Sequence, residues 1–140
     1  MKKLFAFITI LSLFGFSQEN NECNERTIPY WWNGVNSRIE GEKPSLRKAF
    51  KNIQNSETEI TPKNGFITLR LNITKTGKFC DIETFQIDEN YEKTEFNNGK
   101  LAKKIEQIAI KIKDWKRDKD YKTYNLIRLK IKDGKIEEIF

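Results

Sequence analysis

One short stretch in the middle of the chain constrains the fold more than any other feature. In the segment 66–73, the residues after Phe66 alternate strictly between apolar and polar side chains. Successive side chains of an extended strand point to opposite faces, so one face of this segment is wholly apolar: Ile67, Leu69, Leu71 and Ile73. The pattern therefore predicts a half-buried strand, in a sheet that is covered on one face and open on the other.

A second strand is predicted directly after the first. Residues 75–78 contain Gly77, which tolerates a positive φ, and an apolar-rich segment follows at residues 79–87. The two segments together predict a β-hairpin. The apolar positions of the second segment change phase between Ile82 and Phe85, and we interpret this change as a bulge near Glu83 and Thr84.

The flanking segments predict two helices and two more strands. Apolar residues recur at helical spacing in residues 45–53, with Ser45 as a plausible N-cap, and again from Leu101 to Trp115. Residues 124–131 and 135–140 are predicted strands joined by a turn at residues 133–134. We therefore expect an α+β domain of two layers, in the order α-β-β-α-β-β, with two helices packed on one face of a small antiparallel sheet of three or four strands.

The beginning of the chain is typical of an exported protein. Lys2 and Lys3 precede an apolar run of 13 residues, whereas a membrane-spanning helix needs roughly 20. We expect residues 1–17 to be a signal peptide cleaved after Ser17, residues 18–43 an irregular arm, and residues 44–140 the domain. The expected location is the periplasm or the exterior, without stable insertion into a membrane.

The chain has two cysteines, Cys23 and Cys80. An oxidising compartment favours their pairing, so we expect a disulfide that ties the arm to the domain, with two free thiols as the alternative.

The residue types argue against catalysis. The chain has no histidine, the usual general base and metal ligand, and it has neither a C-x-x-C motif nor the spaced carboxylates of an EF-hand, so we expect no metal and no cofactor. Residues 45–48 and 75–77 spell S-x-x-K and K-T-G, but the chain is too short for a serine β-lactamase and lacks an S-D-N element. Asp81 and Glu83 are best explained as solvated residues on a sheet face. Without Lys2 and Lys3 of the expected signal peptide, the net charge falls from +6 to +4, since 24 basic residues then face 20 acidic ones. This mildly basic surface is no strong field for a polyanion, and export also argues against nucleic acid as a partner.

Three neighbouring aromatic residues stand out in the arm: Tyr30, Trp31 and Trp32. Exposed, they could stack on sugar rings or on a partner peptide; the more ordinary interpretation is that they cover an edge or face of the sheet.

The order of these features resembles the C-terminal domain of TonB and its small exported relatives in Bacteroidetes. The resemblance is carried by residues 65–73, Gly77, residues 85–88, the helical pattern that ends in Trp115, and residues 124–131. It implies a non-enzymatic domain that captures an extended peptide, from an outer-membrane transporter or another envelope protein, by adding it as a strand to a sheet edge. By position, the resemblance places that edge at Tyr124, Asn125, Leu126, Ile127, Arg128, Leu129 and Lys130.

The chain departs from TonB in several respects. It has a cleavable leader and three prolines, where TonB has a membrane anchor and a long proline-rich spacer. Residues 135–140 are also positioned to occupy the edge that a peptide would need. We expect a peptide-binding or protein-binding module, and pairing of two copies edge to edge is also open. The alternative function is a secreted adhesion protein that contacts glycan or peptidoglycan through Tyr30, Trp31 and Trp32.

Overall fold

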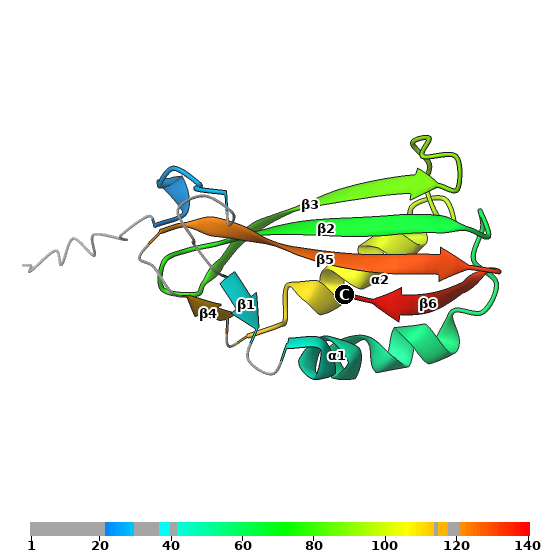
Figure 1. Cartoon of the computed structure of the whole chain (residues 1–140), viewed down its shortest axis with the longest axis horizontal. Helices are drawn as coiled ribbons and strands as arrows, with labels where there is room; N and C mark the ends of the chain where they lie inside the picture. Colours follow the sequence, from blue (N-terminus) through cyan, green and yellow to red (C-terminus); the bar gives the residue numbers. More distant parts are fainter. Residues whose placement is uncertain (1–21, 30–36, 40–41, 114, 118–120) are drawn as a thin grey trace, which may run out of the picture.

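The alternating segment lies inside a four-stranded antiparallel sheet in the computed structural model, which describes residues 22–29, 37–39, 42–113, 115–117 and 121–140. This segment is β2 (Gly65–Ile73), and it pairs with β3 (Phe79–Asp88) on one side and with β5 (Thr123–Lys132) on the other. The last strand, β6 (Lys135–Ile139), pairs with β5, so the strand order is β3-β2-β5-β6 (Figure 1).

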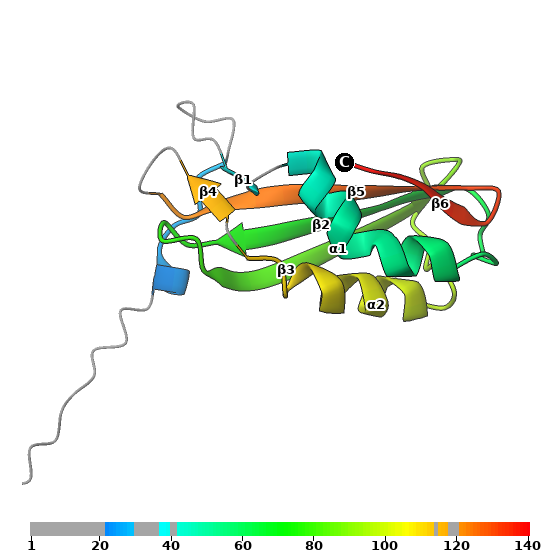
Figure 2. The ribbon, with the colours of Figure 1, turned by 90° about the horizontal axis from the view of Figure 1, so that it is seen from below.

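Two helices accompany this sheet in the described part of the chain. The first, α1 (Glu42–Ser56), runs beside β6, and the second, α2 (Lys100–Ala109), contacts β3 (Figures 1 and 2). The other elements are short: η1 (Glu22–Asn24), β1 (Ser37–Ile39) and β4 (Trp115–Arg117). The predicted α+β class with a four-stranded antiparallel sheet is confirmed.

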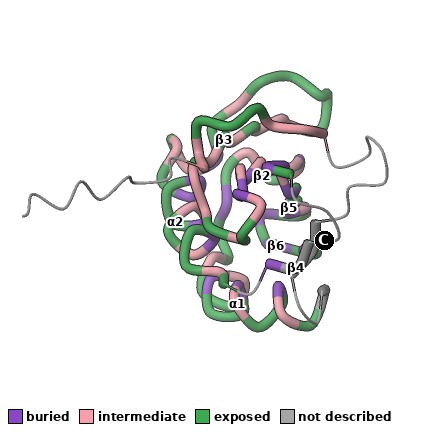
Figure 3. Tube along the Cα trace, turned by 90° about the vertical axis from the view of Figure 1, so that its left-hand side faces the viewer, coloured by how far each residue is buried: buried purple, intermediate pink, exposed green. Residues whose placement is uncertain are grey.

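The apolar face of β2 is the centre of the core. Its odd-numbered residues are buried and its even-numbered residues are partly exposed, as the alternation predicts. Side chains from both helices and from the inner strands complete the core, with Phe50, Ile105, Ile127, Leu129 and Ile131 each at most 1% exposed. In the view along the strands, β3 consists of intermediate and exposed residues, which marks it as a border of the sheet (Figure 3).

Trp115 is buried, but it belongs to a strand and not to the helix that was expected. The helical pattern predicted a single helix through Trp115, but α2 ends at Ala109 and Trp115 lies in β4, opposite Ile39 of β1. Ile39 belongs to the segment predicted to be irregular. A strand that pairs only through such a distant segment has no local signal of its own, and its apolar residue fits the helical spacing equally well.

The predicted bulge is also misplaced. The pairing of β2 with β3 is regular across Glu83 and Thr84, and its register shifts instead between Asn72 and Ile73. The change of phase arises because Phe85 stays on the outer face, 49% exposed, with the guanidinium of Arg70 over its ring at 5.6 Å. An exposed aromatic residue supported by an arginine thus imitates the sequence signature of a bulge.

The first residue of β2 has to be glycine. Gly65 has a φ of 143°, and a Cβ at this position would lie 2.2 Å from the carbonyl oxygen of Ile87. The close approach of the two backbones at this end of the hairpin therefore excludes any side chain.

Candidate functional site

The predicted edge strand, residues 124–130, is an inner strand of the sheet. It belongs to β5, which pairs with β2 along its length and with β6 over its C-terminal half. Asn125, Ile127 and Leu129 are buried, while Tyr124, Leu126, Arg128 and Lys130 alternate with them. The assignment of residues 128–130 to an open edge is therefore wrong, because β6 pairs with them, whereas residues 124–127 lie beyond the end of that pairing.

Strand β6 closes the edge of β5 over residues 128–132, and we call it the seal; it is held by hydrogen bonds, buried side chains and ion pairs. The backbone N–H of Arg128 donates to Phe140 at 2.7 Å, and the N–H of Phe140 donates back to Arg128 at 3.0 Å. Ile136 and Ile139 are buried in the core, at 4% and 2% exposure. Glu137 forms ion pairs with Lys130 at 2.6 Å and with Lys132 at 3.3 Å.

These ion pairs also shift the protonation equilibria. The hydrogen bond from Lys130 lowers the pKa of Glu137, and the same bond raises the pKa of Lys130. Both residues are thus held in their charged forms on the outer surface of the seal.

The opposite border of the sheet, β3, has a short open section. At its C-terminal end the loop returns and pairs with it: the N–H of Asp88 donates to Glu92 at 2.9 Å, and the N–H of Thr94 donates to Gln86 at 3.2 Å. Backbone groups of alternate residues in an antiparallel strand point the same way, so those of Ile82 and Thr84 also point outward. No hydrogen bond to these outward groups is formed by any residue that the structure describes. We call residues 81–85 the β3 window.

A groove lies beside the β3 window. It encloses about 470 Å³ between β3 and α2 and is lined by Phe79, Asp81, Ile82, Lys103, Glu106, Gln107 and Ile110. The hydroxyl of Thr84 donates a hydrogen bond to Glu106, which fixes the helix beside the strand. Ile110 is 44% exposed on the helix side of the window, and Phe85 is exposed on its other side. The window therefore combines free backbone groups with exposed apolar surface on both faces.

The N-terminal end of β3 is tied down by the predicted disulfide. Cys23 and Cys80 are bonded, with their Cα atoms 5.5 Å apart, which confirms that prediction. The hydroxyl of Thr76 donates to Glu22 at 2.6 Å, and this bond lowers the pKa of Glu22. The segment at residues 22–29 thus limits the β3 window at one end, and the loop at residues 89–96 limits it at the other.

The acidic side chains next to the window are engaged on the outer face of the sheet. Arg70 forms a two-pronged ion pair with Glu83, whose hydrogen bond raises the pKa of Arg70, and Asn72 donates to Asp81. The guanidinium of Arg70 also lies 5.3 Å from the ring centre of Tyr124. These contacts agree with the interpretation of Asp81 and Glu83 as residues of a sheet face.

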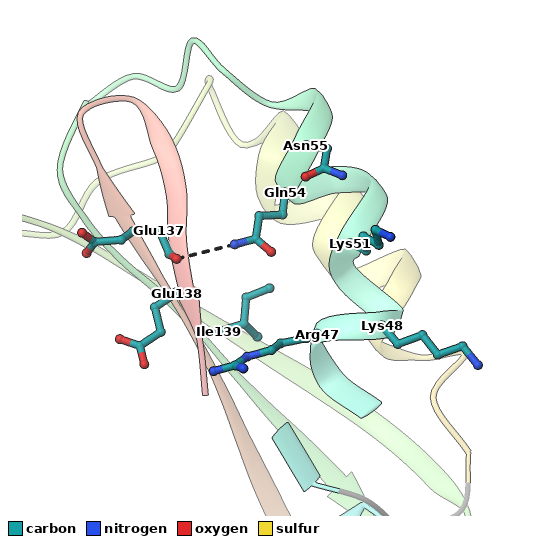
Figure 4. A pocket seen from close by; sticks show the side chains of 8 residues that line it. All are labelled: Arg47, Lys48, Lys51, Gln54, Asn55, Glu137, Glu138 and Ile139. Carbon is teal, nitrogen blue, oxygen red and sulfur yellow. Dashed lines mark hydrogen bonds between the residues drawn. The ribbon is translucent and has the colours of Figure 1, made fainter. Parts of the chain in front are cut away.

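A second, larger groove of about 650 Å³ lies between α1 and β6 (Figure 4). Its helix wall carries Arg47, Lys48, Lys51, Gln54 and Asn55, and its strand wall is formed by residues 137–139. The side-chain amide of Gln54 donates to the carbonyl oxygens of Ile136 at 3.2 Å and Glu137 at 3.5 Å. Helix α1 thus covers part of the outer edge of β6.

Two of the sequence predictions fall on parts of the chain outside the described residues. They are the signal peptide at residues 1–17 and the aromatic residues Tyr30, Trp31 and Trp32. Within the described residues, no three histidine, cysteine or carboxylate side chains gather as metal ligands would. Neither described helix combines the length and hydropathy of a membrane-spanning segment.

Sequence reasoning missed the outward positions of Ile82 and Thr84. The signal that points to them is the predicted tail strand: if residues 135–140 cover β5, then β3 is the border strand that the tail leaves open. Comparison of the chain with family models, curated proteins and solved structures gave no match in any of the three.

Proposed function

We propose that this protein is a non-enzymatic module of the cell envelope that binds an extended peptide by adding it as a strand to the β3 window. The observation that carries the proposal is the outward direction of the backbone groups of Ile82 and Thr84 at the border of the sheet. A peptide paired there forms main-chain hydrogen bonds, while its alternate side chains contact the groove beside α2.

The β3 window is a better site than the edge expected from the resemblance. A peptide could reach the outer side of residues 128–132 only if β6 left the sheet, which would expose Ile136 and Ile139. Exposing two buried isoleucines costs about 3–6 kcal/mol before any gain from binding. Addition at the β3 window displaces no native strand.

The proposal retains the resemblance to the TonB C-terminal domain, with the site moved to the other border of the sheet. It includes the finer arrangement expected from the sequence, with both helices on one face. The partner is then a segment of an outer-membrane transporter or another envelope protein. The leader expected from the sequence of residues 1–17 and the disulfide support a periplasmic or secreted location, because disulfides persist in oxidising compartments.

Self-association through the β3 window stays open. Two copies paired about the centre of the window would bring Glu83 directly opposite its own copy, with Arg70 paired to each of them. The arm with Tyr30, Trp31 and Trp32 stays the alternative contact for a glycan.

A proline substitution tests the proposal with little effect on the fold. Thr84→Pro removes an N–H that points away from β2, so the sheet keeps its ladder of hydrogen bonds, and proline is tolerated on border strands. The matched control, Thr84→Val, also removes the hydroxyl that binds Glu106 but keeps the N–H. We expect an affinity-tagged Thr84→Pro variant to lose its partner from the envelope fraction and Thr84→Val to retain it.

Two outcomes of this experiment count against the proposal. Retention of the partner by a folded Thr84→Pro variant would show that β3 receives no strand. Loss of the partner in a Trp31→Ala/Trp32→Ala variant alone would favour the aromatic arm as the contact.

A further inference from the structure

The groove beside the β3 window is apolar at one end. Helix α2 runs in the opposite direction to β3 (Figures 1 and 2), and within α2 Glu106 accepts the hydrogen bond from Thr84. Ile110 follows one helical turn later, so it lies toward the start of β3. Phe79 and Ile82 line the groove there, and the side chain of Ile110 is exposed. This end of the groove can therefore bury an apolar side chain of a ligand.

The other side of the β3 window is the outer face of the sheet, where Asp81, Glu83 and Phe85 are exposed. The charge of Glu83 is balanced by its ion pair with Arg70. Asp81 accepts a hydrogen bond from the uncharged amide of Asn72, and it forms no ion pair with any residue in the described part of the chain. Asp81 therefore places one uncompensated negative charge beside the outward backbone groups of the window.

An added strand would contact both faces at alternate positions. All strand pairs of this sheet are antiparallel, and a strand added in the same way continues the pattern. Its residues opposite Ile82 and Thr84 exchange backbone hydrogen bonds with them, and their side chains lie on the groove side. Its intervening residues point to the outer face, opposite Asp81, Glu83 and Phe85. The two faces of the window therefore select different kinds of side chain.

We propose that the β3 window selects an extended peptide with a branched apolar residue opposite Ile82 and, next to it, a basic residue opposite Asp81. This inference rests on strand addition at the window and names the class of peptide that is added. The apolar side chain contacts Phe79 and Ile110 in the groove, and the basic side chain pairs with the carboxylate across the two strands. A β-branched residue opposite Phe85 completes the match, because aromatic and β-branched side chains pair favourably across strands.

Three synthetic peptides with blocked ends provide the test. The probe, TVTTIKT, places valine opposite Phe85, isoleucine opposite Ile82 and lysine opposite Asp81. TVTTIET reverses the charge of the lysine, and TVTTTKT replaces the apolar side chain that enters the groove. Each peptide is titrated into the whole protein at low salt, and the amide resonances of Ile82 and Thr84 report where it binds and how tightly. We expect TVTTIET to bind about threefold or more weakly than the probe, and TVTTTKT about tenfold more weakly.

Matched variants locate the two contacts on the protein. Asp81→Lys should reverse the order of the charged peptides, so that TVTTIET binds more tightly than TVTTIKT. Glu59→Lys makes the same change of net charge at an exposed position outside the groove and should keep the wild-type order. Ile110→Gln removes an exposed apolar side chain of the groove, and it should reduce the preference for TVTTIKT over TVTTTKT to within about threefold.

The outcomes separate this selectivity from strand addition itself. Equal affinity of the three peptides, with the resonances of Ile82 and Thr84 shifted by each, overturns the selectivity and leaves strand addition intact. An unchanged order of the charged peptides in a folded Asp81→Lys variant overturns the pairing at Asp81. If no peptide shifts the two resonances, strand addition at the β3 window is wrong, and the selectivity falls with it.

Discussion

The disulfide between Cys23 and Cys80 makes the most quantitative prediction for stability. The two residues are 57 positions apart, and closing a loop of that length restricts the unfolded chain by about 4 kcal/mol in the chain-entropy relation. We therefore expect Cys23→Ser/Cys80→Ser to lower the free energy of unfolding by about 4 kcal/mol. Polar contacts also hold this segment: the N–H of Ile28 donates to Lys122 at 2.8 Å, and the hydroxyl of Thr123 donates to Ile28 at 2.6 Å. Lys75 pairs with Glu25 at 3.0 Å, Thr76 donates to Glu22, and the ammonium of Lys122 donates to the carbonyl oxygen of Cys23.

Urea denaturation followed by circular dichroism measures this loss. With a slope of about 1–3 kcal/mol per molar urea, the midpoint should fall by about 1.5–4 M. Thr76→Val, which removes the hydroxyl that bonds to Glu22 and to Thr74 but keeps the disulfide, serves as a control and should change the midpoint far less. A loss below about 1 kcal/mol in the double variant would refute the reasoning, since the segment at residues 22–29 would then lie outside the cooperative unit of folding.

Three further predictions follow from the packing and the charges. Gly65→Ala should destabilise the fold by about 3 kcal/mol or more in thermal denaturation, because its Cβ would overlap the backbone of Ile87 at a positive φ. Ile139→Ala should lower the free energy of unfolding by about 2–5 kcal/mol and should speed hydrogen exchange of the amides along β6. Unchanged exchange would contradict the tight pairing of β6 with β5. The difference in stability between wild type and Glu137→Gln should be present between about pH 5 and 10. It should diminish as the pH falls through the lowered pKa of Glu137 or rises through the raised pKa of Lys130.

The sequence predicts those parts of the fold whose signals are local. The alternation in residues 66–73 identifies β2 because one face of the strand is apolar and buried, whereas the other face is largely polar and partly exposed. The turn at Asp133 and Gly134 was also predictable, and both residues have the positive φ that this hairpin turn requires. The first half of the predicted long helix is confirmed for the same reason, because Leu101 and Ile105 are buried in α2.

The site was harder to predict because it depends on which strand remains at the border. That choice is made by β6, whose apolar residues, Ile136 and Ile139, can be buried only against a core assembled from distant segments. The hairpin signal at residues 133–134 predicted β6 itself. It did not predict whether β6 or a bound peptide would pair more stably with β5. Burial of two isoleucines favours pairing of the tail with β5, and this leaves the border at Ile82 and Thr84 open.

Hydrogen exchange at single amides of β3 tests strand addition at the β3 window most directly. In the free protein we predict fast exchange at Ile82 and Thr84, whose N–H groups point outward, and slow exchange at Glu83 and Phe85, whose N–H groups pair with β2. Addition of the captured partner should slow exchange at Ile82 and Thr84 alone. Protection of these two amides before any partner is added, or no change once it is bound, would contradict the account.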